Sequence, residues 1–488
     1  MMLVRNMNKS IKLNAILNAI RQCIAILYGM FTIPYVSRIL GSDGYGKINF
    51  SMSLVNYFIL FAGLGVSTYA IREGARLRND NKALQKFVNE VFSINIISSV
   101  TSLTVLFLLC FSVTTLHRYA DIIFILSIQI IFITLGTDWI NVIFEDYLYT
   151  TVRIIIVYVV SIFILIFFVK KPEDYLMYAV VVASNKIISN VINLFYIRRR
   201  YIRPKLTRSI HFREHIIPLL ILFFNALTIS VYVDSDKTML SIFKSDSVTG
   251  VYSVAVNIYV VIKTLVNAMT AVALPRLSKY LGDNNNKAYN EMISKMVHAL
   301  LLLVLPCSIG LFFLSEKIIL ILSGEAYLSG VVALKILSVS LIFGTLSYCV
   351  VYAILIPHKM EKKCFIASIT GALINVFLNL ILIPTYSLNG AAFTTLISEL
   401  IVVVISYYFG RNCINIKLSI KNGVSLIIAN ATVVIICLLT NHYITNTYLC
   451  LGTCMFTCAI SYFLLLFIFK DKVFYPIISN TIRKLVQK

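Results

Sequence analysis

The sequence predicts an all-α membrane protein with about fourteen transmembrane helices, and three observations support this prediction. First, 59% of the 488 residues are apolar and the mean hydropathy is +0.88. Second, only 13% of the residues are charged, which is about half the share in a soluble domain. Third, the connections are short: the longest polar stretch, Arg198 to Arg213, leaves no room for a soluble domain. These observations exclude a soluble enzyme, a disordered chain and a fibrous protein.

The apolar residues are gathered in fourteen stretches along the chain. Most stretches reach about 20 residues, the length of a membrane-spanning helix, whereas strands of a membrane barrel would alternate over about ten residues. We expect no cleavable signal, because the first stretch is too long and contains Arg21. The expected helices are at about 12–40, 48–71, 87–112, 119–141, 150–169, 175–197, 214–243, 249–275, 296–315, 331–357, 364–384, 389–410, 422–440 and 446–469.

Lys and Arg are distributed unevenly between the two sides of the membrane. Counted over alternate loops, the side that holds the N-terminus carries 30 of these residues and the other side carries 6. Cytoplasmic loops are enriched in Lys and Arg, so we expect both termini in the cytoplasm. The same bias explains most of the net charge of +22 and requires no nucleic-acid partner.

A faint internal repeat relates two parts of the chain. Leu40–Asp43 precedes the second stretch and Phe243–Asp246 precedes the eighth, about 203 residues later. Arg72 and Arg276 follow the ends of the same two stretches. Repeats of this kind are common in transporters. We expect an N-terminal six-helix lobe at 1–208, a C-terminal six-helix lobe at 209–410, and two additional helices with a cytoplasmic tail at 411–488.

Some cations fall inside the expected helices. A charge in the bilayer core is costly, so such a residue faces a partner or water and often marks a functional site. The seven cations of this group are Arg21, Arg38, Arg153, Lys186, Lys237, Lys263 and Lys335.

Arg21 lies about nine residues into the first helix, so it is roughly 13 Å deep at 1.5 Å per residue. Asn14, Asn18 and Gln22 share its helix face, because the spacing is i, i+4, i+7, i+8. One interpretation is a buried ion pair that fixes helix packing. The interpretation we favour is a cationic substrate site in a wet cavity, formed by these four residues.

Lys263 is the second candidate for a substrate-binding cation. It lies midway along the eighth stretch, and Asn267 follows it one helical turn later on the same face. Because Arg21 and Lys263 belong to different halves of the repeat, we expect them to share a cavity between the halves. Lys186 is also central but stands among Val, Ile and Ala, so we rank it lower.

Glu399 is the central carboxylate of the twelfth stretch. It could pair with a membrane lysine or carry a coupling proton, and the sequence leaves both interpretations open. Asp236 ends a polar stripe on the seventh stretch, so we include it among the substrate-binding candidates.

Several motifs with catalytic associations are better explained in other ways. Gly41–Lys47 fits the spacing of a phosphate loop but lacks the following Ser or Thr and a preceding strand, so we interpret it as a tight turn between helices. Asp234–Asp236 resembles the metal-binding pair of glycosyltransferases but lacks their soluble domain. The six histidines form no recognisable catalytic constellation. We therefore expect no enzyme, no cofactor and no metal.

Three of the ten cysteines share one face of the last apolar stretch, at Cys450, Cys454 and Cys458. A metal or redox cluster is one interpretation. We favour the other, in which these residues are small apolar packing side chains.

Several segments resemble the polysaccharide exporter family, the flippases for lipid-linked O-antigen and capsule repeat units. The segments are Pro34–Gly41, Gly44–Gly46, Tyr69–Glu73, Asp138–Trp139, Glu145–Asp146, Tyr149–Arg153, Leu274–Ser278 and Gly371–Asn375. The family belongs to the multidrug/oligosaccharidyl-lipid/polysaccharide superfamily. The chain departs from the family pattern at Asp234–Lys237, which usually carries Asn and fewer charges.

The resemblance implies fourteen helices in two lobes, alternating access and the bacterial inner membrane. It implies a substrate of undecaprenyl pyrophosphate that carries a short oligosaccharide, moved for O-antigen or capsule synthesis. Expected partners are this lipid-linked oligosaccharide, the lipid bilayer, and the polysaccharide polymerase and chain-length machinery. An ion-coupled exporter of small drugs with the same fold is the alternative.

Four further residues complete the set of expected site residues. Arg72 and Arg276 would capture the incoming pyrophosphate at the cytoplasmic side, although positive-inside bias alone would also place them there. Arg153 is a further substrate-binding candidate, and Asp138 joins Glu399 as a candidate for ion coupling.

Overall fold

The structure, a computed structural model, describes residues 11–414 and 420–476. Every secondary-structure element in these residues is a helix, which confirms the predicted all-α fold. Eleven of the helices are long and apolar enough to cross a membrane, or twelve if the bent helix α9 forms one span. The chain is therefore a multi-pass membrane protein. The total of fourteen spans and the cytoplasmic termini stay predictions, and residues 1–10 and 477–488 lie outside the described residues.

The chain divides into two compact units, Met1–Ser241 and Ile242–Lys488. The helices that begin in unit 1 are α1 (Ile11–Gly63), α2 (Val66–Leu77), α3 (Asn81–Ser112), α4 (Thr114–His117), α5 (Ala120–Gly136), α6 (Trp139–Ile143), α7 (Tyr147–Phe168), η1 (Pro172–Asp174), α8 (Tyr175–Arg200) and α9 (Phe212–Phe243). Those of unit 2 are α10 (Asp246–Gly282), α11 (Asn286–Ser323), η2 (Glu325–Gly330), α12 (Val331–Cys349), η3 (Val350–Leu355), α13 (Glu361–Gly410), η4 (Arg411–Cys413), α14 (Ile420–Tyr443) and α15 (Thr447–Ile468). The three-part division at 208 and 410 stays a prediction.

Two long helices contain a residue at which the backbone is not helical. α1 breaks at Gly41 (φ 66°, ψ 178°), and α13 breaks at Ser387 (φ 54°, ψ −135°). Glycine adopts a positive φ readily because it has no Cβ. The interhelical turn predicted at Gly41–Lys47 is therefore a break at one residue, after which the helix resumes.

The second expected helix, 48–71, was placed too far along the chain. α1 ends at Gly63, and Leu64 and Gly65 both have positive φ before α2 begins. A Cβ on Gly65 would lie 2.8 Å from the carbonyl oxygen of Leu219 in α9. Gly65 is thus required both by its φ of 73° and by this close approach.

The expected helix 119–141 is also divided. Thr137 (φ 45°) separates α5 from the short helix α6. This turn places Asp138 at the start of α6, outside α5.

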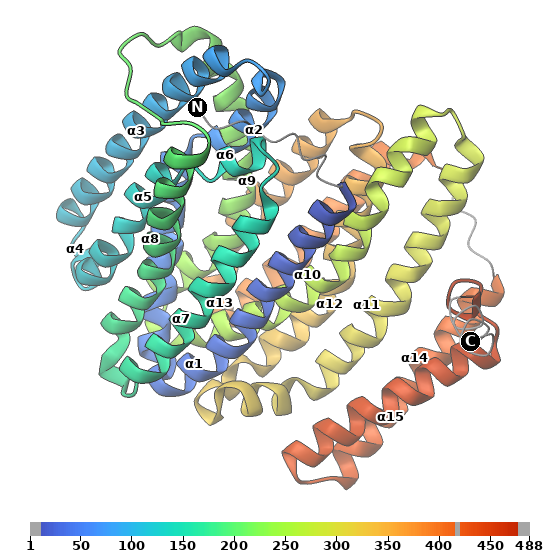
Figure 1. The fold of residues 1–488 in the computed structure, drawn as a ribbon. Coiled ribbons are helices and arrows are strands. Elements are labelled where there is room, and N and C mark those ends of the chain that lie inside the picture. Colours follow the sequence, from blue (N-terminus) through green and yellow to red (C-terminus); the bar gives the residue numbers. More distant parts are fainter. Residues whose placement is uncertain (1–10, 415–419, 477–488) are drawn as a thin grey trace. The chain divides into compact units, whose positions relative to one another are not determined.

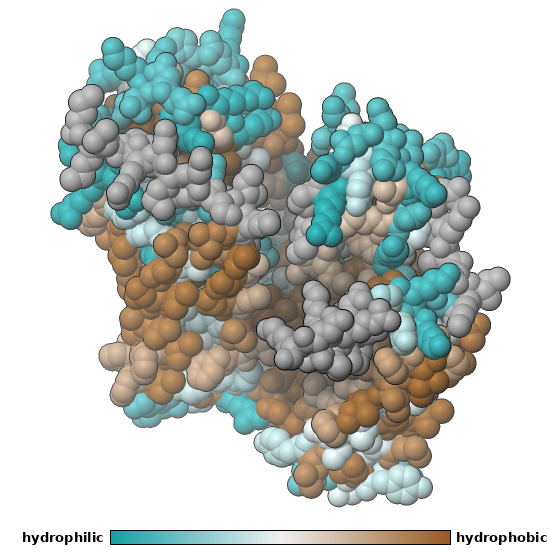
Figure 2. Space-filling model, turned by 45° about the vertical axis from the view of Figure 1, so that its right-hand side comes forward, coloured by the Kyte–Doolittle hydropathy of each residue, from teal (hydrophilic) through white to brown (hydrophobic). Residues whose placement is uncertain are grey.

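Unit 1 is held together by tight helix packing. α5 runs beside α8 (Figure 1), where Leu126 and Ile130 are fully buried near the small residues Ala179 and Ala183. Small residues let membrane helices approach closely. Figure 2 shows apolar side chains along the helix flanks and polar ones at the helix ends, the distribution expected where lipid tails cover the flanks.

Candidate functional site

The first part of α1 carries the polar face predicted around Arg21. The Arg21 guanidinium donates to Asn18 Oδ1 (2.8 Å), and Asn14 Nδ2 donates to Glu145 Oε2 (3.3 Å). Gln22 is exposed. Within the described residues no carboxylate forms an ion pair with Arg21, and both interpretations of this residue stay predictions.

Arg153 on α7 forms an ion pair with Asp138. The guanidinium Nη2 lies 2.7 Å from Asp138 Oδ1, and the side chains are 2% and 53% exposed. The guanidinium carbon lies 5.4 Å from the centroid of the Tyr149 ring. The Nε and Nη1 atoms of Arg153 are buried and make no hydrogen bond within the described residues. Arg153 therefore has hydrogen-bonding capacity that Asp138 does not use.

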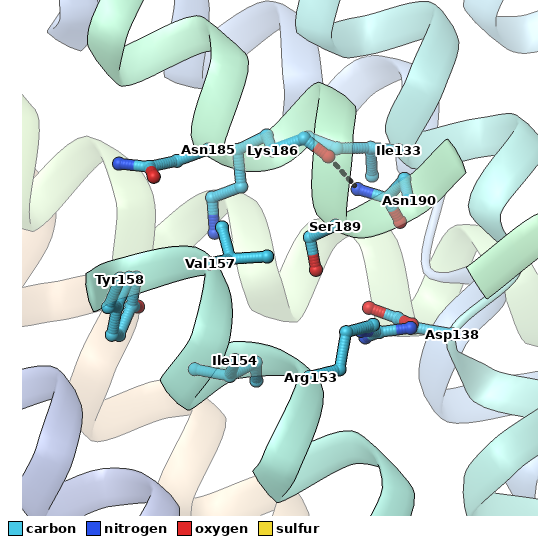
Figure 3. A pocket seen from close by; sticks show the side chains of 10 residues that line it. All are labelled: Ile133, Asp138, Arg153, Ile154, Val157, Tyr158, Asn185, Lys186, Ser189 and Asn190. Atoms are coloured by element: carbon cyan, nitrogen blue, oxygen red, sulfur yellow. Dashed lines mark hydrogen bonds and ion pairs between the residues drawn. The ribbon is translucent and has the colours of Figure 1, made fainter. Parts of the chain in front are cut away.

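The Asp138–Arg153 pair lines a cavity of about 200 Å³ between α5, α7 and α8. Polar and apolar side chains share its wall (Figure 3). The lining residues are Ile133, Asp138, Arg153, Ile154, Val157, Tyr158, Asn185, Lys186, Ser189 and Asn190. An anion or a sugar could find a cation and hydrogen-bonding groups here together.

Lys186, which the sequence analysis ranked below Lys263, also lines this cavity. Its side chain extends from α8 toward Val157 and Tyr158 of α7 (Figure 3). Within the described residues its ammonium group forms no ion pair and no hydrogen bond. The sequence signal was the central position of Lys186 together with Asn185 and Asn190, but neighbours on its own helix could not show the cavity.

Tyr28 connects the Arg21 face to this cavity. It lies seven residues after Arg21, so both residues are on one face of α1. The Tyr28 hydroxyl accepts from Asn185 Nδ2 (2.9 Å) and lies 2.9 Å from Ser161 Oγ. Its ring stacks on Tyr158 with a centroid distance of 4.3 Å. Unit 1 therefore presents one polar surface from Asn14 to the cavity, which we call the unit 1 polar surface.

In unit 2, Lys263 forms an ion pair with Glu399. The Tyr259 hydroxyl donates to Glu399 Oε1 (3.2 Å), and Ser347 Oγ donates to Glu399 Oε2 (3.2 Å). A Cβ on Gly344 would lie 2.9 Å from Lys263 Cε, so this glycine makes room for the pair. Of the two interpretations of Glu399, the structure shows the pairing with lysine.

Of two other predicted site residues, Asn267 in unit 2 is partly buried and Asp236 in unit 1 is buried. Asn267 lies one turn after Lys263 on α10, and its Oδ1 is buried without a hydrogen bond within the described residues. Asp236 of α9 is 5% exposed, and the charge of Lys237 acts on it. The common cavity predicted for Arg21 and Lys263 stays a prediction, because these residues lie in different units.

Arg72 and Arg276, the arginines expected to capture substrate at the cytoplasmic side, are exposed. Arg72 lies on α2 and pairs with its neighbour Glu73 at 2.8 Å. Arg276 lies near the end of α10, which extends to Gly282 rather than ending near Pro275. Capture of substrate by these residues stays a prediction.

A histidine network that the sequence analysis missed holds the start of α9 in unit 1. His215 Nε2 lies 3.0 Å from Glu90 Oε2, and His215 Nδ1 lies 2.8 Å from the Tyr69 hydroxyl. His211 Nδ1 lies 3.2 Å from Glu90 Oε1. Glu90 and His215 are buried. These contacts join α2, α3 and α9, which the spacing of histidines in the sequence could not reveal.

Asp146 anchors the segment between α6 and α7. It accepts hydrogen bonds from the hydroxyls of Tyr196 (2.5 Å) and Tyr201 (2.6 Å). Burial and the bond to Asp146 raise the pKa of Tyr201 above its ordinary value, so its hydroxyl stays a donor. This contact supports the loop that carries Glu145, the partner of Asn14.

Comparison with known proteins agrees with the fold and with the sequence resemblance. A protein of Escherichia coli (strain K12) provisionally named an O-antigen transporter is 24% identical over 409 residues, which is 83% of this chain and 98% of that protein. The capsular polysaccharide biosynthesis protein CapF of Staphylococcus aureus is 29% identical over 160 residues, 33% of this chain and 40% of that protein.

Solved structures share the fold. The lipid II flippase MurJ in an inward closed conformation has a TM-score of 0.76 at 18% identity, covering 94% of this chain and 99% of that chain. An inward-facing multidrug resistance transporter of the MATE family has a TM-score of 0.60 at 15% identity, covering 81% of this chain and 97% of that chain.

The family model for polysaccharide biosynthesis proteins matches residues 11–281, more than half of the chain, and includes the unit 1 polar surface. The resemblance to polysaccharide exporters is thereby confirmed, and the chain belongs to the polysaccharide biosynthesis protein family.

Proposed function

We propose that the chain is a flippase for lipid-linked oligosaccharides. In this proposal it moves undecaprenyl-pyrophosphate-linked repeat units across the bacterial cytoplasmic membrane by alternating access, for O-antigen or capsule synthesis. The single observation that carries the proposal is the unit 1 polar surface, in which two cations without an acidic partner among the described residues, Arg21 and Lys186, border hydrogen-bonding groups.

The charge of this surface suits a pyrophosphate. Arg153 and Asp138 offset each other, so Arg21 and Lys186 leave an excess of positive charge. Cations at membrane depth are costly unless they serve a partner, and a pyrophosphate headgroup is such a partner. Arg21 offers a planar fork that matches phosphate oxygens, while Lys186 offers a point charge.

The neutral groups of the same surface suit sugar hydroxyls. Asn185, Ser189 and Asn190 line the cavity beside Tyr158. Amides and hydroxyls can both donate and accept, and aromatic rings offer flat apolar faces for sugar rings. A cavity of about 200 Å³ has room for part of an oligosaccharide headgroup rather than for the whole of it.

The charge distribution disfavours the alternative of a small-drug exporter. Such an exporter would hold cationic substrates with membrane carboxylates. The two carboxylates considered for ion coupling, Glu399 and Asp138, already pair with Lys263 and Arg153. A coupling role for either carboxylate, with protons or sodium, stays part of the proposal, as do the polymerase and chain-length partners.

The proposal can be tested in proteoliposomes that contain the purified full chain and a fluorescent undecaprenyl-pyrophosphate oligosaccharide. Translocation is measured as the fraction of headgroups that an external glycosidase reaches. We expect transport of this lipid and no transport of a cationic dye. Dye efflux without lipid translocation would contradict the proposal and favour the drug exporter.

A further inference from the structure

Three thiols from two helices meet in unit 2. Sγ atoms lie 3.6 Å apart for Cys437 and Cys454, 3.9 Å for Cys454 and Cys458, and 4.0 Å for Cys437 and Cys458. Figure 1 shows α14 and α15, which supply them, side by side. Cys450, which shares the α15 face of Cys454 and Cys458, stays outside the cluster, because its thiol donates to the Thr440 carbonyl oxygen (3.4 Å).

We propose that Cys437, Cys454 and Cys458 form a binding site for a soft metal ion, Cu(I). A point equidistant from their sulfurs lies about 2.2 Å from each. This matches a metal–thiolate bond of about 2.3 Å within the tolerance of about 0.2 Å for a plausible site. The sulfurs therefore need little rearrangement to bind one ion.

The surroundings favour Cu(I) over zinc. Within the described residues the group of potential ligands contains these three cysteines and no fourth side chain. Cys437 and Cys454 are buried among apolar residues that include Val433 and Leu426. Structural zinc sites are almost always four-coordinate, whereas soft thiolates also select Cu(I), which accepts three of them.

Binding of the ion would release protons from the thiols, because the thiolate is the ligand. A cation lies close enough to offset part of the resulting charge: the charge of Lys317 acts on Cys454. The Lys317 ammonium also donates to the Ile444 carbonyl oxygen (3.2 Å), which holds it near the α14–α15 connection.

Two of the three cysteines lie nearer to the α14–α15 connection than to the other end of their helices. Cys437 is six residues before the end of α14, and Cys454 is seven residues after the start of α15. In the predicted topology the connection between these helices faces away from the cytoplasm, so the ion would enter from that side. The bound ion would join α14 to α15, a role that does not depend on the proposed transport activity.

The test uses the purified full chain, reduced and without oxygen, titrated with Cu(I) in the presence of a competing Cu(I) chelator. We expect one Cu(I) per chain, with X-ray absorption showing sulfur ligands at about 2.2–2.3 Å. Cys454→Ser should weaken the retention of Cu(I) against the chelator at least tenfold. Cys110→Ser, which removes a buried thiol in unit 1, is the matched control and should leave retention unchanged.

A measurement on the unmodified chain guards against variants that fold poorly. Cu(I) should slow alkylation of Cys458, the least buried thiol of the three, at least tenfold, and should leave exposed Cys307 unaffected. Failure of the wild-type chain to retain Cu(I) against the chelator would overturn the proposal. Equal retention of zinc, or a disulfide between Cys437 and Cys454 that forms with no Cu(I) binding, would also overturn it.

Discussion

Asn185 on α8 donates a hydrogen bond of 2.9 Å to the hydroxyl of Tyr28 on α1. This contact joins the helix face that carries Arg21 to the cavity that carries Lys186. It places Arg21 and Lys186 on the common unit 1 polar surface, although 165 positions separate them in the sequence.

Removing the Tyr28 hydroxyl should weaken transport without unfolding the protein. A typical hydrogen bond contributes about 0.5–1.5 kcal/mol, so Tyr28→Phe should lower translocation in proteoliposomes about 2- to 10-fold. The ring still stacks on Tyr158, so the yield should stay normal. Tyr35→Phe, on the same helix as Tyr28, is the matched control: it loses a bond to the Val169 carbonyl oxygen at the end of α7 and should keep full activity.

Lys186→Met should remove a charge from the cavity while it keeps the length of the side chain. We expect at least a tenfold loss of lipid translocation, with normal membrane abundance because no ion pair of the described residues is broken. Lys186→Arg should retain part of the activity. The control is Lys335→Met, a membrane lysine of unit 2 that lies 5.7 Å from the Phe312 ring. Equal losses in both Met variants would argue against a specific role for Lys186.

Asp138→Asn should destabilise the protein, because it leaves the charge of buried Arg153 without its partner. We expect the free energy of unfolding to fall by about 1–3 kcal/mol. This is less than the 3–5 kcal/mol lost when a fully buried pair is broken, because Asp138 is half exposed. Adding Arg153→Met should recover part of the loss. Thermal unfolding in detergent measures both effects, and additive losses in the double variant would mean that the pair is not coupled.

The stability that Asp471 contributes at the end of unit 2 should depend on pH. Burial opposes the charge of Asp471, but bonds from His298 and from the amides of Phe474 and Val473 outweigh it and hold its pKa below its ordinary value. Asp471 therefore stabilises the fold above its unfolded pKa, about 3.9, and this contribution is lost as the pH falls through the lower folded pKa. The difference in Tm between wild type and Asp471→Asn should be present at pH 7 and should shrink below about pH 4. If the difference in Tm stayed constant with pH, the titration of Asp471 would be excluded as the source of that difference.

Hydropathy was sufficient to predict the all-α fold and most helix positions, because a membrane helix must be apolar over its whole length. The Arg21 face was also predictable, since its members are on one helix at regular spacing. The breaks at Gly41, Thr137 and Ser387 were harder to predict, because they depend on local backbone conformation within apolar runs.

The partners of the buried charges were mostly beyond the sequence. Arg153 and Asp138 are adjacent only because Thr137 turns the chain between α5 and α6. The Lys186 cavity needs three helices, and the thiol cluster needs Cys437 from a helix that the expected face did not include. Packing between helices decides these positions, and the spacing of residues along one helix does not predict that packing.

We propose that the cations of the unit 1 polar surface bind the pyrophosphate of the lipid carrier. The most direct measurement is surface display of polysaccharide in a strain that lacks the native gene, with membrane abundance measured in parallel for Arg21→Ala and Arg21→Lys. We expect no display with Arg21→Ala at normal abundance. We expect partial display with Arg21→Lys, which keeps the charge but loses the bidentate fork. Normal display by a normally abundant Arg21→Ala protein would contradict a role of Arg21 in binding the pyrophosphate.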